Sequence, residues 1–280
     1  MRVFALGLAI AALISMDTSA SQAPSTGDVL KRAAAYVDDY RRSLETIVAE
    51  ERYVQRSSSP RGTADSSERV LRSDFMLLPG VAGENPWFAF RDVFEVDGVP
   101  VTGERGRLEG WLSDSRSSLL QKARALALEQ ARYNIGPVMR TINVPTLALE
   151  ILTSRNQERF RFRRRGSTTM NGIDLMIISF EERRRPTMIR TPEGRDLPAS
   201  GSLWIEPGTG RVIRTELRTG ERRSDRIEAA ITVSYVFVPR LDLLLPGTME
   251  ERYVGPGADI ACRADYSNFR RFETDARIIR

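Results

Sequence analysis

Histidine is absent from the 280 residues of this chain. This absence excludes catalytic triads and Cys-His pairs, which use an imidazole as the base, and it excludes zinc sites with histidine ligands, including the HExxH helix. Gly-rich phosphate loops and EF-hand spacings are not found either. The sequence therefore predicts no metal site, no cofactor and no catalytic residues, and only carboxylate chemistry remains open to an enzyme.

Cysteine occurs once, at Cys262, so no intramolecular disulfide can form and packing alone must stabilise the fold. Cys262 alternates with Ile260, Ala264 and Tyr266 along an apparent strand. This pattern favours a buried, small apolar side chain over a reactive thiol.

Lysine is scarce as well, because only Lys31 and Lys122 are lysines and 40 of the 42 basic residues are arginine, in a chain of net charge +5. A genome rich in G and C would produce this bias without selection on function. The functional alternative is that the rigid guanidinium fork serves phosphate or carboxylate ligands.

The first twenty residues contain Arg2, then an apolar run at residues 3–14, and then small or polar residues up to Ala20. This is the pattern of a secretory signal peptide, and we expect cleavage after Ala20, with Ala23 as a later candidate. The run is too short for a helix that spans a bilayer, which needs about 20 apolar residues. The sequence predicts a periplasmic or secreted protein without a stable transmembrane anchor, and this address argues against nucleic acid as a partner.

Apolar residues at three- and four-residue steps predict a helix from Ser25 to about Val48, with Ser25 and Asp28 as a capping-box-like start. The polar stretch at 57–67 contains Pro and Gly and predicts a mobile loop.

Two more helices are expected further along. One covers residues 115–134 after a cap at Asp114, and a short one covers residues 145–154. We see no internal repeat and no domain boundary, so residues 21–280 are expected to form a single domain.

Strand patterns dominate the rest. Residues 68–80 and 86–98 read as two strands, and about eight follow from residue 158 to the end, including a hairpin over 200–219 that turns at Pro207-Gly208-Thr209-Gly210. Short connections favour antiparallel neighbours. The sequence thus predicts an α+β fold in which a large curved antiparallel sheet is covered on its apolar face by helices from the N-terminal half.

Asp92 is unusual, because alternation along its strand places it on one face with Phe88, Phe90 and Phe94. A buried carboxylate needs a partner or has its pKa raised. The alternative is that a bulge or a strand edge lets Asp92 reach solvent or an arginine.

The segment ERFRFRRR at 158–165 alternates arginine with phenylalanine. Its arginines lie at intervals of about 6.6 Å on one strand face, and Phe160 and Phe162 lie on the other. Such a comb suits an amphiphile whose anionic head group stays outside while its acyl chain lies within. The alternative is a solvated face that is balanced by acidic neighbours.

Two carboxylates alone can hydrolyse a glycoside when they lie about 5–10 Å apart. The pairs Asp92 with Glu95 and Glu181 with Glu182 are poor candidates, because residues one or three positions apart point to opposite faces of a strand. We therefore expect a protein that is not an enzyme, although acids from different strands could still converge.

The succession GSLWIEPGTGRVIRTEL, ITVSYVF, LLLPGTMEERY and ADYSNFRRF resembles the C-terminal half of the LolA/RseB-like family of periplasmic proteins, which includes proteins that sort outer-membrane lipoproteins. The resemblance covers residues 155–272 and lies in strand patterning. It implies an unclosed antiparallel half-barrel with an N-terminal helix and lid helices. It further implies a hydrophobic cavity that accepts an acyl chain of a lipoprotein or a similar lipid.

Two functions follow from these patterns. The first is an exported, non-enzymatic protein that holds a lipid, an acyl chain or a lipoprotein between sheet and helices; the second is a protein-interaction module of an envelope complex, with a filled core and no small ligand. For the first, the large side chains assigned to inward faces are the candidate ligand contacts, and two arginines are the candidates for the head group. These residues are Phe88, Phe90, Phe94, Tyr235, Phe237, Arg161 and Arg163.

Overall fold

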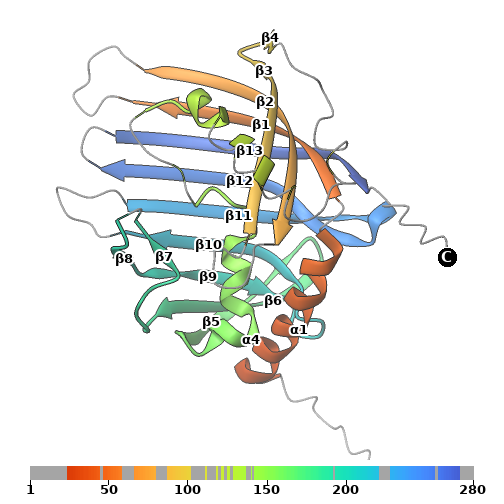
Figure 1. The fold of residues 1–280 in the computed structure, drawn as a ribbon. Helices are drawn as coiled ribbons and strands as arrows, with labels where there is room; N and C mark the ends of the chain where they lie inside the picture. The colour runs from red at the N-terminus through yellow and green to blue at the C-terminus, as the bar shows by residue number, and fades with distance from the viewer. Residues whose placement is uncertain are drawn as a thin grey trace, which may run out of the picture.

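The computed structural model in Figure 1 shows one broad, open sheet with helices on one of its faces. It describes residues 24–44, 47–58, 66–79, 87–101, 129–136, 142–191, 193–220, 228–255 and 258–271, together with residues 111, 118, 121, 122, 125, 126 and 140. The predicted leader at 1–20, the cap at Asp114 and most of the predicted loop at 57–67 lie outside these residues. Within the described part, no helix is long and apolar enough to cross a membrane.

Helix α1 (Thr26–Leu44) begins as predicted, because the Asp28 backbone N–H donates to the Ser25 hydroxyl at 3.2 Å. The helix is amphipathic and buries one stripe. That stripe consists of Val29, Leu30, Ala33, Ala34, Val37, Tyr40 and Leu44. The predicted extension to Val48 is wrong, since strand β1 starts at Ile47.

The main sheet has 11 strands, all paired antiparallel, in the order β4-β3-β2-β1-β13-β12-β11-β10-β9-β6-β5. The strands from the N-terminal half are β1 (Ile47–Ser57), β2 (Ser67–Pro79), β3 (Trp87–Val96) and β4 (Val99–Pro100). Those from the C-terminal half are β5 (Phe160–Met170), β6 (Ile173–Glu182), β9 (Ala199–Ile205), β10 (Val212–Thr219), β11 (Glu228–Val238), β12 (Leu243–Gly255) and β13 (Ala258–Arg271). The predicted α+β class with an unclosed antiparallel sheet is confirmed.

Differences from the sequence-based expectation are local. The predicted strand at 186–191 shortens to β7 (Ile189–Arg190), which pairs with β8 (Asp196–Leu197) in a separate ladder. The predicted helix at 145–154 is the 3-10 helix η2 (Leu147–Leu152), followed by the short α4 (Ser154–Gln157). The predicted helix at 115–134 is described only in part and ends in the 3-10 turn η1 (Ala131–Tyr133), and another such turn, η3 (Pro239–Leu241), precedes β12.

We call the sheet face under α1 and η2 the inner face, and the opposite one the outer face (Figure 1). Alternation along β11 puts Ile231, Val233 and Tyr235 on the inner face, as predicted, within one continuous apolar core. The carboxylate of Glu150 in η2 is fully buried and binds Arg41 of α1 at 2.9 Å and Arg155 at 3.1 Å. This ionic contact ties the covering helices to one another.

The hairpin over 200–219 is β9 and β10, and its turn touches the covering helix. Arg32 of α1 donates to the Pro207 carbonyl at 2.8 Å. Gly210 has φ +78°, and a Cβ there would lie 2.4 Å from the Arg32 carbonyl carbon. Glycine at 210 therefore allows both the turn and the close approach of the helix backbone.

This contact predicts that Gly210→Ala destabilises the fold more than two matched changes. Gly172 has a similar positive φ but open space around its Cβ position, so Gly172→Ala should lower the free energy of unfolding by roughly 1 kcal/mol. Gly208 has neither the positive φ nor a close neighbour, so Gly208→Ala should cost less. Urea unfolding of the three variants tests the order. If Gly210→Ala destabilises the protein no more than Gly172→Ala, the backbone of α1 near Arg32 must be able to move away at little energetic cost.

Burial also predicts how three alanine substitutions rank in the stability that they remove. Ile231 is buried in the core, whereas Trp204 is half-buried on the outer face and Phe237 is 48% exposed. Ile231→Ala should therefore lose roughly 2–5 kcal/mol, and Trp204→Ala and Phe237→Ala should each lose less. The midpoints and slopes of urea melts measure this, and the reverse order would contradict the assignment of the two faces.

Candidate functional site

The inner face carries a group of buried polar side chains among the apolar ones, which we call the inner polar cluster. Alternation along β1, β2, β3, β12 and β13 brings most of them to this face, and one arginine comes from the segment after η1. The cluster consists of Glu51, Tyr53, Gln55, Ser73, Arg91, Arg140, Glu251, Tyr253 and Tyr266.

Glu51 in β1 is 1% exposed and pairs with Arg91 in β3, whose Nε donates to Oε2 at 2.7 Å. The Ser73 hydroxyl donates to the same oxygen at 3.2 Å, and Arg91 also donates to the Asn143 carbonyl at 3.0 Å. Burial lowers the pKa of Arg91, but the Coulombic attraction and the hydrogen bond to Glu51 outweigh it, so the pKa of Arg91 is raised. Arg91 therefore keeps its charge in this buried site.

The Arg91 guanidinium is also held by aromatic rings. Its Cζ lies 5.7 Å from the ring centroid of Tyr53 and 5.1 Å from that of Phe75. Cations are attracted to the faces of such rings at this distance. The arginine therefore has a fixed position on the inner face.

Arg140 joins the cluster from outside the sheet. Its guanidinium donates to Gln55 Oε1, to the Tyr53 hydroxyl at 3.3 Å and to the Ile135 carbonyl at 2.8 Å. Gln55 Oε1 accepts a further bond from the Ile135 backbone N–H at 3.1 Å. Arg140 thus fastens the segment after η1 onto β1.

Glu251 in β12 is 3% exposed and accepts a hydrogen bond from the Tyr253 hydroxyl. Burial raises the pKa of Glu251, against the hydrogen bond from Tyr253 and the charges of Arg91 and Arg140. Burial likewise raises the pKa of the Cys262 thiol to about 11, and Cys262 is a buried, free cysteine, as predicted.

Several polar atoms of the cluster have no hydrogen-bond partner in the described part of the chain. These are Glu51 Oε1, Glu251 Oε1, the Tyr266 hydroxyl and Arg140 Nε, and two of these residues, Glu51 and Tyr266, lie opposite each other in the β1–β13 pair and interact without a well-formed hydrogen bond. Burial and the charge of Glu51 hold the pKa of Tyr266 well above its usual value. Buried polar atoms are normally satisfied, so a cluster of exceptions indicates a place where water or a ligand completes the bonding.

A pair of catalytic acids is not favoured here. Glu51 lies opposite Tyr266, and Glu251 lies opposite Cys262, with β13 between the two glutamates. This register puts their Cα atoms roughly 16 Å apart in a regular sheet. Among the described residues, no group of three or more acidic or sulfur ligands could hold a metal ion.

The structure separates the apolar residues singled out from the sequence. Tyr235 lies in the inner core, where its hydroxyl donates to the Pro145 carbonyl at 2.7 Å, while Phe237 beyond a register shift is largely exposed. Phe90 is buried opposite Met76, outside the inner core, and Phe94 lies at a bulge under the Arg72 guanidinium. The side chain of Phe88 lies outside the described part.

Asp92 is buried, which is the first of the two environments considered from the sequence and the one that calls for a partner. It lies opposite Asp74, which is also buried and accepts a hydrogen bond from Arg270 at 2.8 Å. Register therefore brings an arginine from the C-terminal strand β13 to this acidic pair, which the local pattern could not indicate.

Arg161 and Arg163 lie together on the outer face, away from Phe160 and Phe162, as the alternation predicted. They line a groove of about 380 Å³ over β5, β6, β9 and β10. The other lining residues are Arg165, Ser179, Phe180, Glu181, Ser200, Gly201, Ser202, Glu216 and Arg218. The arginines and the inner core are thus on opposite sides of the sheet.

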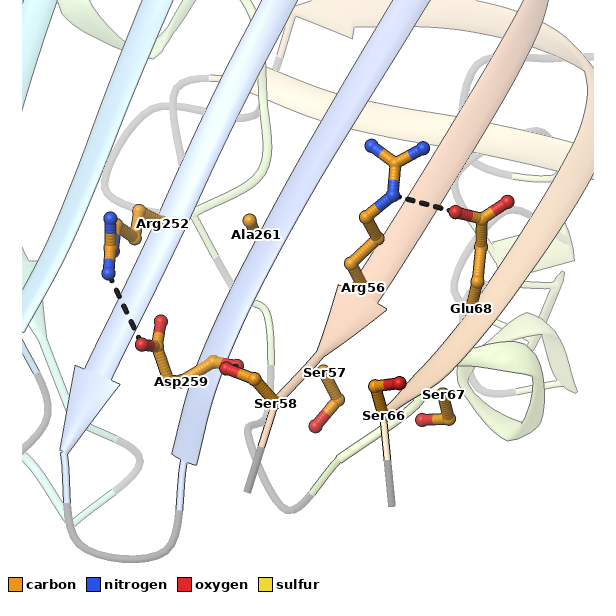
Figure 2. Close-up of a pocket in the computed structure, with 9 residues that line it drawn as sticks. All are labelled: Arg56, Ser57, Ser58, Ser66, Ser67, Glu68, Arg252, Asp259 and Ala261. Atoms are coloured by element: carbon orange, nitrogen blue, oxygen red, sulfur yellow. Dashed lines mark hydrogen bonds and ion pairs between the residues drawn. The ribbon is translucent and has the colours of Figure 1, made fainter. Parts of the chain in front are cut away.

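Figure 2 shows a second outer groove, of about 440 Å³, at the ends of β1, β2, β12 and β13. Arg56 and Arg252 stand on either side of Ala261, and each turns to an acid of its own. Arg56 binds Glu68 at 2.6 Å, and Arg252 binds Asp259 at 3.2 Å. The two charges are compensated, so this groove has no excess positive charge, unlike the groove lined by Arg161 and Arg163.

The inner polar cluster was not predicted, although the sequence contains a signal for it. Glu251 shares a strand face with Met249 and Tyr253, and Glu51 shares one with Ala49 and Tyr53. An acid at an apolar position of a strand is the same anomaly that singled out Asp92. For Glu51 the signal was hidden, because no strand was predicted at 47–57, where β1 lies.

Comparisons with known proteins concern the fold. No protein-family model and no curated protein matches this sequence. A crystal structure of a putative outer membrane lipoprotein-sorting protein domain from Vibrio parahaemolyticus is similar, with 12% identity, a TM-score of 0.40, and coverage of 88% of this chain and 94% of that one. A DUF1329 family protein from Desulfovibrio piger is similar at 12% identity and TM-score 0.38, over 90% and 95% of the two chains. A LolA superfamily protein from Nitrosomonas europaea is similar at 11% identity and TM-score 0.36, over 92% and 98%.

The described structure itself has the architecture that the resemblance to LolA/RseB-like proteins implied. An unclosed antiparallel sheet is covered on one face by an N-terminal helix and by a later helical segment.

Titration of Glu251 gives a test of the site. The raised pKa means that the folded state binds this proton more tightly than the unfolded state, so stability from this group is present at low pH and lost as pH rises. Glu251→Gln keeps the acceptor for Tyr253 and removes the titration. Its unfolding free energy relative to wild type should therefore increase from pH 4 to pH 8.

The control is Glu250→Gln, which changes the neighbouring acid on the outer face, where Glu250 binds Arg263 at 2.6 Å. That variant should show no such gain. Urea melts at several pH values measure both, and a difference for Glu251→Gln that does not change with pH would contradict the raised pKa.

Proposed function

We propose that this chain is an exported, non-enzymatic binding protein of the cell envelope that holds an amphiphile on the inner face of its half-barrel. The polar group of the ligand would meet the inner polar cluster, and its lipid or acyl part would lie along the neighbouring apolar side chains. A lipid and the acyl chain of a lipoprotein are the ligand classes that fit this combination.

One observation carries the proposal. Glu51, Glu251 and Tyr266 each bury an oxygen without a well-formed hydrogen bond in the described part of the chain, although Tyr266 interacts with Glu51 and Tyr53 with Glu251, and all three lie on one face of the sheet. Leaving a polar atom buried and unpaired costs about 1–3 kcal/mol, so three such atoms are expensive unless a ligand or water completes them. Apolar side chains flank them on the inner face, among them Leu71, Phe75 and Val93.

The position of the polar atoms suggests where the ligand lies. Under α1 and η2 the inner face of β9 and β10 carries mainly apolar contacts, among them Leu203, Ile205 and Ile151, which are fully buried in the core. The unpaired oxygens lie on β1, β12 and β13 instead. We therefore expect the ligand over these strands and not beneath α1.

The close-packed half of the interior also supports the second candidate, a protein-interaction module of an envelope complex without a small ligand. In that case the inner polar cluster is structural, and ordered water satisfies its free oxygens. The two candidates differ in whether an amphiphile enters the protein.

Native mass spectrometry of the gently purified chain should show a bound lipid, and Tyr266→Phe provides the sharper test. This change removes the buried hydroxyl with its interaction with Glu51 and keeps the ring contact with Phe75, so the stability of a purely structural cluster should change little. A ligand-binding cluster should lose affinity. We expect roughly a tenfold weaker displacement of a fluorescent fatty acid by oleate or phosphatidylglycerol, with uptake of the uncharged dye N-phenylnaphthylamine much less affected.

Glu51→Gln against Glu50→Gln forms a matched pair, since the two acids are neighbours in β1 on opposite faces of the sheet. Only Glu51→Gln, on the inner face, should weaken binding of the fatty acid. Circular dichroism and melting curves check that both variants fold. If wild type copurifies with no lipid and binds neither the fatty acid nor the dye, the binding function fails and the interaction module becomes the better account.

A further inference from the structure

We propose that the outer groove lined by Arg161, Arg163 and Arg218 is a second binding site, which takes a phosphate ester whose alcohol part carries hydroxyl groups. This site is on the sheet face opposite the inner polar cluster, so it goes beyond the proposed function and does not depend on it.

The shape of the groove comes from small residues in the middle of four strands. Arg161, Glu181, Ser200 and Arg218 form one row across β5, β6, β9 and β10. Three strand spacings put the first and last members of this row about 14 Å apart. Long arginine side chains therefore stand on both walls, with serine side chains on the floor between them.

Gly201 in β9 contributes to this floor. A Cβ there would lie 1.8 Å from the Glu216 carbonyl oxygen and 2.8 Å from Phe180. This Cβ position points to the inner face, because Gly201 alternates with Ser200 and Ser202 and lies beside the buried Phe180, so Gly201 contributes only backbone to the floor. The floor is thus built by the backbone as well as by small side chains.

The charge of the groove is not balanced. Its two acids are already engaged with arginines beside the groove, because Glu181 binds Arg183 at 2.6 Å and Glu216 binds Arg214 at 3.0 Å. The guanidinium groups of Arg161, Arg163 and Arg218 have no ion pair or hydrogen bond in the described part of the chain. The contrast with the groove in Figure 2, where each arginine has its own acid, indicates that this imbalance is local.

A phosphate ester matches these groups. Guanidinium forks bind phosphate oxygens in a bidentate manner, and arginines from two walls can hold a tetrahedral group between them. The Ser200 and Ser202 hydroxyls have no hydrogen bond in the described part and can donate to the same oxygens. Glu181 and Glu216 can accept from hydroxyls of the alcohol part, which favours glycerol or a sugar over a simple alkyl group.

Two sources offer this chemistry, a soluble polyol phosphate and the head group of a phospholipid such as phosphatidylglycerol. Calorimetric titration with glycerol phosphate tests the first. Flotation with phosphatidylcholine vesicles that contain phosphatidylglycerol tests the second. Binding in either assay that is lost in the groove variants described below supports the site and identifies its source.

The variant to test combines Arg161→Ser, Arg163→Ser and Arg218→Ser. It should lower the affinity for whichever of the two probes binds, glycerol phosphate or the vesicles, at least tenfold. The control removes three other arginines of the outer face through Arg52→Ser, Arg56→Ser and Arg252→Ser, and should change the affinity less than twofold. Because exposed charges are screened within about 10 Å at 0.1 M salt, all titrations are made at that ionic strength or above.

A filling variant separates the groove from a diffuse positive surface. Ser202→Leu occupies the floor without changing the charge, and it should also reduce binding at least tenfold. Equal losses in the two triple variants, or no loss in Ser202→Leu, would overturn the proposal, as would wild type that binds neither probe. Arginines on the edge strand β5 would then serve only to prevent pairing with another sheet, and the triple variant should self-associate. Tyr266→Phe should leave binding in the groove unchanged, which keeps this result separate from the inner-face proposal.

Discussion

The pairing of β1 with β13 is the constraint on which the rest of the structure depends. It runs antiparallel from Ile47 opposite Arg271 to Ser57 opposite Ile260, and it joins the strands of the N-terminal half to those of the C-terminal half. Without it, β2 and β3 would have no place in the main sheet, and β13 would be an open edge. The contact closes a loop that runs from Ser57 to Ile260, which is costly in entropy and requires the wide burial that follows.

The same pairing creates the inner polar cluster. It places Glu51 and Gln55 of β1 beside Tyr266 and Cys262 of β13, and β12 then adds Glu251 on the far side of β13. Arg91 and Arg140 come from segments that reach this face only because β1 is in the sheet. The cluster is therefore a property of the assembled half-barrel and not of any single hairpin.

Burying two carboxylates and two guanidinium groups is a weak source of stability, because desolvation offsets most of the attraction between them. Removing one partner is nevertheless strongly destabilising, so the set constrains how β1, β3 and β12 pack together. A binding function would account for the arrangement without requiring a gain in stability. Its free oxygens then face the ligand, while Arg91 and Arg140 fix the carboxylates and the covering segment.

Local patterns were sufficient for the strands and hairpins of the C-terminal half. Alternation, together with turns such as Asn171-Gly172, where both residues have positive φ, predicted most of β5, β6 and β9–β13 and the correct faces of Ile231 and Trp204. The same reasoning predicted α1 from its capping residues and its stripe, and it placed Arg161 and Arg163 on the outer face. These features depend on neighbours within about ten residues, which the sequence displays directly.

Only the tertiary structure decided where α1 ends and which polar side chains the inner face buries. Ile47 and Val48 continue the helical spacing of α1, and the hydrogen bonds to β2 and β13 that make them a strand come from residues far away in the sequence. Glu51 and Gln55 appear solvent-facing in isolation, since their partners Arg91 and Arg140 are about 40 and 85 residues away. A polar residue can be buried when a distant partner meets it, and single-sequence periodicity contains no record of that partner.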